Sequence, residues 1–155
     1  MKVYLVQHGE AEPASVEPAR PLTERGRRDV QCVAACAGRL AFEVQQIRHS
    51  GKTRAEQTAA LFAYALSPPD GVVSVSGLAP KDDVVPVADA LERESRPVML
   101  VGHLPLMARL ASCLVTGDAE RPAVRFVNGG VVCLERKDAC WLVSWILTPE
   151  MARAV

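Results

Sequence analysis

The chain has 155 residues, a length that fits one domain with a full hydrophobic core, so we expect residues 1–155 to form a single domain. Apolar residues make up 49% and charged residues 23%, which is ordinary for a soluble globular protein. Eighteen basic and eighteen acidic side chains cancel, which excludes the strongly basic footprint of a nucleic-acid binder. We therefore expect no nucleic-acid partner.

The N-terminal sequence indicates a cytoplasmic protein. Only six residues separate Met1 from a polar turn, too few for the apolar region of a signal peptide. The longest uncharged apolar stretches, such as residues 98–102, fall far short of the ~20 residues that span a bilayer. The five cysteines form no CxxC pair, which argues against a disulfide framework and a zinc ribbon. Cys32 and Cys36 are expected to be small buried side chains on one helix.

Short β-type runs alternate with longer helical runs along the chain. The first half is expected to contain a strand over 2–6, a polar loop over 10–21, a helix over 23–40, a strand over 42–47 and a helix over 52–66. The second half is expected to contain a strand over 72–75, a helix over 82–91, a strand over 97–102, a helix over 105–114, and closing strands over 129–135 and 140–146 joined by a turn at 136–138.

This alternation predicts an α/β fold, a three-layer α/β/α arrangement with a mostly parallel central sheet. In such folds, ligands bind at the carboxyl ends of the strands. His8 follows the first predicted strand, Ser50–Arg54 follows the second, and His103 follows the fourth. These polar groups are therefore expected at one edge of the sheet.

His8 ends a predicted buried strand, where both ring nitrogens of a structural histidine would need partners. Gly9 removes a side chain, so that another group or a ligand can approach closely. A neutral imidazole at this place is a competent nucleophile toward phosphorus. Taken alone, the His-Gly pair also fits a plain turn histidine.

His103 and Arg54 each precede or open a predicted helix. The N-terminus of a helix attracts anions, and a histidine there can donate to a phosphoryl oxygen or bond the local backbone. Arg54 and Lys52 oppose the helix dipole, which an anionic ligand would explain. An ion pair between Arg54 and Glu56 is the alternative.

Four motifs occur in order: His8-Gly9, Pro21-Leu22-Thr23-x-x-Gly26, Ser50-x-x-x-Arg54-Ala55-x-Gln57-Thr58 and Gly102-His103-Leu104-Pro105. With these motifs the chain resembles the histidine phosphatase superfamily, which has the phosphoglycerate mutase-like fold. It is most similar to the compact SixA-type phosphohistidine phosphatases. The similarity spans nearly the whole chain, including Asn128-Gly129-Gly130 and the closing Trp145–Pro149 segment.

The resemblance implies a mechanism without metal or cofactor. His8 would attack phosphorus and become phosphorylated, water would release phosphate, and the cationic groups would stabilise the phosphoryl oxygens. It assigns His8 and His103 to catalysis, and Arg54, Gln7, Gly9 and Ser50 to phosphate binding. The expected substrate is phosphohistidine on a protein, such as a histidine phosphotransfer domain.

Position 7 departs from the superfamily, whose first motif is Arg-His-Gly. The Gln7 amide carries no charge and cannot form a two-pronged clamp. Loss of one such donor typically costs about 10²–10³ in rate, although Lys52 can supply some positive potential. Gln7 therefore leaves a low-activity phosphate-binding module as one alternative function. A phosphatase of small phosphorylated metabolites is the other.

The general acid is left open by the sequence. Four carboxylates lie in predicted loops near the site, where they can also be solvated charges or helix caps: Glu10, Glu12, Asp82 and Asp83. A weak acid matters less for a phosphohistidine, because its P–N bond is labile. His49 is expected to face away from the site, and no HxH or HxxxH spacing supports a zinc site.

Overall fold

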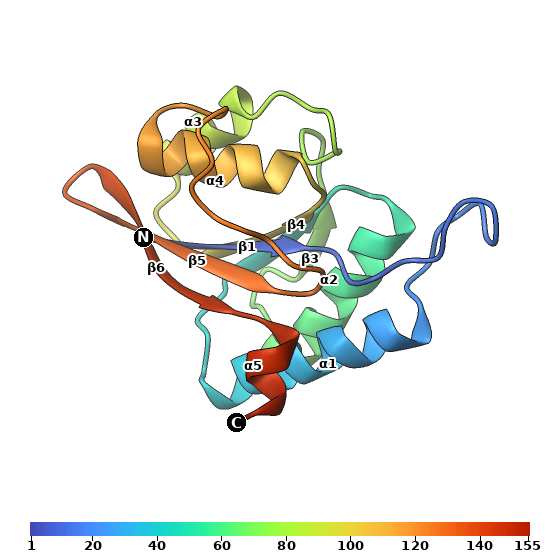
Figure 1. Ribbon diagram of the computed structural model, residues 1–155. Coiled ribbons are helices and arrows are strands. Elements are labelled where there is room, and N and C mark those ends of the chain that lie inside the picture. The colour runs from blue at the N-terminus through green and yellow to red at the C-terminus, as the bar shows by residue number, and fades with distance from the viewer.

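Six strands form one sheet that helices cover on both faces (Figure 1). The computed structural model describes all 155 residues. The strands are β1 (Lys2–Gln7), β2 (Gln46–His49), β3 (Val72–Ser74), β4 (Val98–Gly102), β5 (Val131–Lys137) and β6 (Cys140–Leu147). The helices are α1 (Glu24–Arg39), α2 (Thr53–Leu66), α3 (Val85–Arg93), α4 (Leu106–Thr116) and α5 (Pro149–Arg153).

The strand order is β3-β2-β4-β1-β5-β6. The pairings β2–β3, β2–β4 and β1–β4 are parallel, while β1–β5 and β5–β6 are antiparallel. The predicted mostly parallel α/β sheet is therefore confirmed. The carboxyl ends of β1, β2 and β4 lie at one edge, as the alternation of strands and helices indicated.

Two apolar layers enclose the sheet. Helices α1, α2 and α5 pack on one face, and α3 and α4 pack on the other (Figure 1). Alternate side chains of β1 point to opposite faces of the sheet. Tyr4 and Val6 pack in one buried cluster, and Val3 and Leu5 pack in the other. This two-sided burial holds the end of β1 in a fixed position.

The first helix follows its sequence signals closely. The Thr23 hydroxyl accepts a hydrogen bond from the Gly26 backbone at 2.9 Å and caps α1. Of the apolar positions expected on this helix, Val30, Val33, Ala34 and Ala37 are buried, whereas Leu40 is the C-cap and is exposed. The two cysteines of α1 were both expected to be buried. Cys36 is buried, whereas Cys32 is half-buried.

Several predicted boundaries were wrong. The second strand begins at Gln46 rather than residue 42, because Phe42 lies in a loop and stacks on Tyr4 with ring centroids 5.4 Å apart. The closing hairpin turns at Asp138 and Ala139, which both have positive φ, rather than at 136–138. Helix α5, capped by Thr148, was not predicted.

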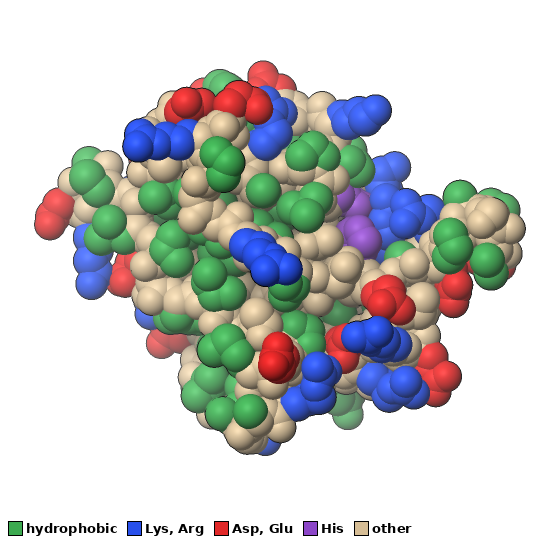
Figure 2. All heavy atoms as spheres, viewed as in Figure 1, with side chains coloured by type: hydrophobic (Ala, Val, Ile, Leu, Met, Phe, Trp, Pro, Cys, Tyr) green, Lys and Arg blue, Asp and Glu red, His purple; other side chains and the backbone are tan.

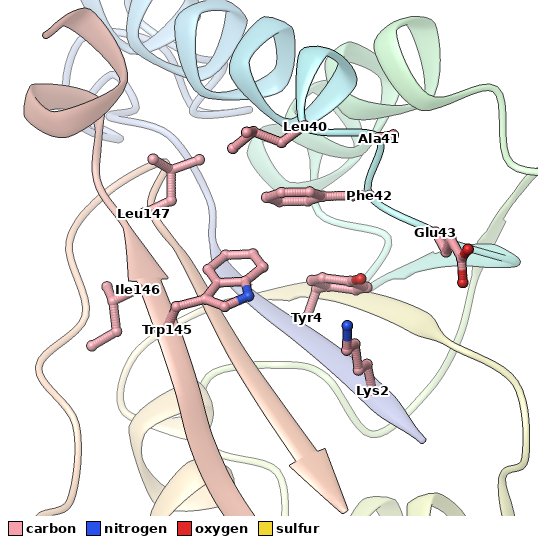
Figure 3. A pocket seen from close by; sticks show the side chains of 9 residues that line it. All are labelled: Lys2, Tyr4, Leu40, Ala41, Phe42, Glu43, Trp145, Ile146 and Leu147. Carbon is pink, nitrogen blue, oxygen red and sulfur yellow. The ribbon is translucent and has the colours of Figure 1, made fainter. Parts of the chain in front are cut away.

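A groove of about 540 Å³ lies near the amino ends of the parallel strands, remote from the edge that carries His8. Tyr4, Phe42 and Trp145 pack together along it, with Lys2 and Glu43 nearby (Figure 3). The groove therefore belongs to a different part of the surface from the candidate site. No helix is both long enough and apolar enough to cross a membrane.

Candidate active site

His8 stands directly after β1, and its backbone is held from two sides. Its N–H donates to the Gly102 carbonyl of β4 at 3.0 Å. Its own carbonyl accepts from the Asn128 side chain at 3.0 Å and from the Gly129 N–H at 3.2 Å. The Asn128-Gly129-Gly130 motif thus fixes the strand end that carries the histidine.

The hydrogen bonds of the His8 ring define its tautomer. Nδ1 lies 2.7 Å from the Gly9 carbonyl oxygen. Because a carbonyl only accepts, Nδ1 must carry the hydrogen, and Nε2 of the neutral ring keeps its lone pair. Nε2 accepts a hydrogen bond from Arg54 Nε at 3.3 Å. The nitrogen available as a nucleophile is therefore the one beside the guanidinium.

His103 lies next to His8, with ring centroids 4.9 Å apart and the ring planes at 54°. The residue is only 1% exposed. Its Nε2 is hydrogen bonded to Ser50 Oγ at 2.6 Å, and its buried Nδ1 has no partner in the protein. This nitrogen is enclosed by the protein, and an unpaired buried polar atom is costly.

Helix α2 positions Arg54 and supports the end of β1 through a single face. The Thr58 hydroxyl accepts from the Gly9 N–H at 3.0 Å and donates to the Arg54 carbonyl at 2.7 Å. Gln57 Oε1 accepts from the Leu22 N–H at 2.8 Å. The Arg54-Ala55-x-Gln57-Thr58 motif therefore joins three segments that are distant in the sequence.

The structure shows which group approaches Gly9 closely. A Cβ at this position would lie 2.7 Å from Val30 Cγ2 and 3.1 Å from the Gly26 carbonyl oxygen. Helix α1, and not a ligand, therefore requires the glycine. Gly26 has the matching role, since its Cβ would lie 2.1 Å from the Glu10 carbonyl oxygen.

Both histidines are uncharged at neutral pH. Burial lowers the pKa of His8 to about 4, with Arg54 and Arg20 lowering it further and the Gly9 carbonyl opposing the shift. Burial lowers the pKa of His103 to about 3, assisted by repulsion from a protonated His8 and by the positive charges of Arg54, Lys52 and Arg20. Burial and the Arg20 charge also lower the pKa of Arg54. The site is thus built of neutral rings among cations, an environment that favours an anion.

The cationic surroundings are visible at the surface. Figure 2 shows the histidine side chains beside a group of Lys and Arg side chains, on the side from which the loop between β1 and α1 projects. Arg20 belongs to this loop, and sequence reasoning missed it. An arginine in a proline-bearing loop carries no periodic signal that would have placed it near His8.

The remaining sequence candidates occupy different positions. Gln7 is half-buried at the end of β1, and its amide oxygen has no donor. His49 is buried and accepts the Gly51 N–H on Nδ1 at 3.1 Å, outside the His8–His103 pair. No group of three or more His, Cys, Asp or Glu side chains is arranged to hold a metal ion.

Three of the four candidate carboxylates have local partners. Asp82 accepts from the Ala79 N–H, and Asp83 accepts from the Val85 N–H at the start of α3. Glu10 accepts from the Thr23 hydroxyl at 2.9 Å. Neither aspartate is the N-cap of α3, which is Val84 without a side-chain cap, so the expected helix-cap role of Asp82 or Asp83 was wrong and both instead bond local backbone. None of the four carboxylates is among the charges that shift the pKa of His8 or His103.

No protein-family model matches the chain. The phosphohistidine phosphatase SixA of Escherichia coli K12 is 30% identical over an alignment of 163 residues that covers all of both chains. Among solved structures, the protein histidine phosphatase SixA in complex with tungstate has a TM-score of 0.84 at 26% identity, over 96% of this chain and 97% of that one. A SixA-like protein from Agrobacterium tumefaciens shares the fold, with a TM-score of 0.76 at 22% identity over the same shares of the chains. The chain therefore belongs to the histidine phosphatase superfamily as a SixA-type phosphatase.

Proposed function

We propose that this chain removes phosphoryl groups from phosphohistidine on a protein, through a phosphohistidine intermediate on its own His8. The observation that carries this proposal is the state of the His8 ring. Its Nδ1–H is fixed on the Gly9 carbonyl, and its Nε2 lone pair lies beside the Arg54 guanidinium. A neutral, oriented imidazole next to a cation is what in-line attack on a phosphoryl group requires.

In the first step, Nε2 of His8 forms a bond to phosphorus while the bond from phosphorus to the substrate nitrogen breaks. The departing imidazole takes a proton from solvent. In the second step, water attacks the phosphorus, the P–Nε2 bond breaks, and the excess proton passes to solvent. Inorganic phosphate leaves and His8 returns to its starting state.

The surrounding residues stabilise the charge on the transferring group. Arg54 binds phosphoryl oxygens as a cation, and His103, oriented by Ser50, donates a hydrogen bond to them. Gln7 donates through its amide at the end of β1, while the backbone of Gly9 orients the nucleophile. These groups supply the charge that a metal supplies in other phosphatases, so no metal is part of the proposal.

The choice of a phosphohistidine substrate has two supports. The curated relative of known function is a phosphohistidine phosphatase, and the SixA structure holds tungstate, a tetrahedral oxyanion like phosphate. Arg54, Arg20 and Lys52, and no carboxylate, are the fixed charges that act on the histidine pair. A site without a dedicated acid favours a leaving group such as imidazole over an alkoxide.

The substrate is tested by comparing phosphate release from a phosphorylated histidine phosphotransfer domain and from phosphoserine. Release from the domain with a kcat/KM at least tenfold higher supports the proposal. Faster release from phosphoserine, together with a loss of that activity in Glu10→Gln, Glu12→Gln, Asp82→Asn or Asp83→Asn, assigns the chain to small phosphorylated substrates. Binding of phosphate without release from either substrate assigns it to phosphate-binding modules.

The intermediate is tested by quenching the reaction in alkali, because phosphohistidine survives alkali and is lost in acid. Labelled phosphate should stay on the wild-type chain and be absent from His8→Asn. His49→Asn serves as the matched control, since His49 lies outside the pair. Activity that is lost on treatment with EDTA and restored by a divalent cation would contradict the metal-free mechanism.

A further inference from the structure

Arg54 is the only arginine or lysine whose side chain is hydrogen bonded to the nucleophile. A bound phosphoryl group carries close to two negative charges, and the Gln7 amide at the end of β1 carries none. One guanidinium leaves such a dianion incompletely neutralised in a half-buried pocket. Neutralising such a dianion therefore requires a second cation that has no other partner.

Arg20 stands in the arm between β1 and α1 (residues 10–22), which projects from the body of the protein (Figure 1). The base of the arm is held by an antiparallel bridge between Ala11 and Leu22. It is held further by a hydrogen bond from the Glu12 N–H to the Pro21 carbonyl at 2.8 Å. Arg20 follows the arm's tip and directly precedes this paired base.

The conformation of Arg20 is fixed at both backbone and side chain. Its φ of 50° is in the left-handed region, which non-glycine residues adopt at a cost. Its N–H donates to the Glu17 carbonyl at 2.9 Å, and its Nε donates to the Glu12 carbonyl at 3.1 Å. The side chain is thus anchored through Nε, while its two terminal nitrogens remain available.

No carboxylate neutralises this guanidinium. Eight ion pairs occur in the chain, and Arg20 is in none of them. Its charge instead acts on the three groups of the candidate site, since it lowers the pKa of His8, of Arg54 and of His103. The arm is also tied to the helix that carries Arg54, because the Leu22 N–H, two residues after Arg20, donates to Gln57 Oε1 of α2 at 2.8 Å. An anion between Arg20 and these three groups would relieve this repulsion.

We propose that Arg20 is the second phosphoryl-binding cation of this site, donating from its terminal nitrogens to oxygens of the bound group beside Arg54. This inference rests on the proposed phosphatase mechanism and adds a residue to it. The charge missing at position 7 is thereby supplied from the arm. Lys52 is the competing source of charge, but it is exposed and acts on His103 without acting on His8 or Arg54.

The test compares three substitutions that each remove one positive charge: Arg20→Gln, Lys52→Gln and Arg27→Gln. Arg27 is the matched control, because it is an exposed arginine of α1 with no ion pair and no effect on either histidine. Two quantities are measured on each protein: the affinity for tungstate by calorimetry, and kcat/KM for a phosphorylated phosphotransfer domain.

Arg20→Gln should weaken tungstate binding at least tenfold and lower kcat/KM by about 10²–10³, the usual cost of one oxyanion donor. Arg20→Lys should recover part of both losses, because lysine keeps the charge and loses the planar fork. Lys52→Gln should have a smaller effect, and Arg27→Gln should stay within twofold of the wild type. Arg20→Gln within twofold of wild type, or a larger loss in Lys52→Gln, would overturn the proposal.

The two readouts separate this inference from the function on which it rests. If the wild type binds tungstate but turns over no substrate, the phosphatase mechanism fails, and the affinity series still decides the role of Arg20. If the wild type is active and Arg20→Gln keeps full affinity and rate, the mechanism survives and only the role of Arg20 fails. A Gln7→Arg background adds a check: Arg20→Gln should cost less there than in the wild type, since position 7 then carries charge.

Discussion

Ser50 Oγ lies 2.6 Å from Nε2 of His103 and joins the loop after β2 to the loop after β4. The hydroxyl is the only protein partner of the His103 ring, whose Nδ1 is buried without a hydrogen bond. Because neutral imidazole carries one hydrogen, the partner of one nitrogen influences what the other can offer to a ligand. Ser50 is therefore placed to orient His103 for the phosphoryl group.

Replacing Ser50 by alanine should lower kcat about tenfold, because a hydrogen bond of this kind contributes about 1–1.5 kcal/mol and its loss frees the ring to rotate. Ser50→Thr keeps the hydroxyl and should retain most of the activity. Steady-state kinetics on a phosphorylated substrate measures both variants. Equal rates for Ser50→Ala and the wild type would show that His103 is held without this contact.

Thr58→Val should destabilise the fold by about 1–3 kcal/mol, because it leaves the buried Gly9 N–H without an acceptor. The Thr58 hydroxyl is fully buried and also donates to the Arg54 carbonyl, so no water replaces it readily. Thr58→Ser keeps both hydrogen bonds and should lose less. Urea unfolding measures the difference, and a Val variant as stable as the Ser variant would contradict this account of the motif.

Arg54→Lys should lower kcat/KM by about 10²–10³ although the charge is retained. Lysine has no Nε–H group to donate to His8 and no planar fork for phosphoryl oxygens. Arg96→Lys is the matched control, since Arg96 is exposed and precedes β4, at the end of the strand remote from His103. A lysine variant with wild-type kinetics would show that Arg54 supplies only charge.

The edge of the sheet that carries the site was predictable, because the hydrophobic pattern marks β1 and β4 as buried parallel strands. Residues directly after such strands lie at the same edge of the sheet, so His8 and His103 could be expected there. The strand order that makes β1 and β4 neighbours was not encoded in the hydrophobic pattern. The hydrogen bonds of Thr58 and Asn128 could not be predicted from the sequence, because a motif does not say which backbone groups its side chains bind.

Two features that the sequence did not settle have a common physical origin. Gly9 was expected to allow close approach by another group or by a ligand, and the group that approaches is Val30 of α1. Arg20 was overlooked because its position depends on a left-handed backbone and on the bridge at the base of the arm. Both depend on tertiary contacts across the β1–α1 connection, and no local periodicity encodes them.

The pH dependence follows from the lowered pKa values of the two histidines. Both rings should give the NMR signals of neutral imidazole at pH 7 and titrate near pH 4 for His8 and near pH 3 for His103, instead of near 6.5. The unfolded chain takes up these protons below about pH 6.5, while the folded chain does not until the lower values. The contribution of the two histidines to stability is therefore fully present above pH 6.5. It should decline as the pH falls toward 4, by about 1.4 kcal/mol per pKa unit.

Tungstate should raise the pKa values of both histidines, because a dianion favours the charged rings. His8→Asn and His103→Asn assign the signals, and a ring that titrates near 6.5 without ligand would contradict the cationic, buried site.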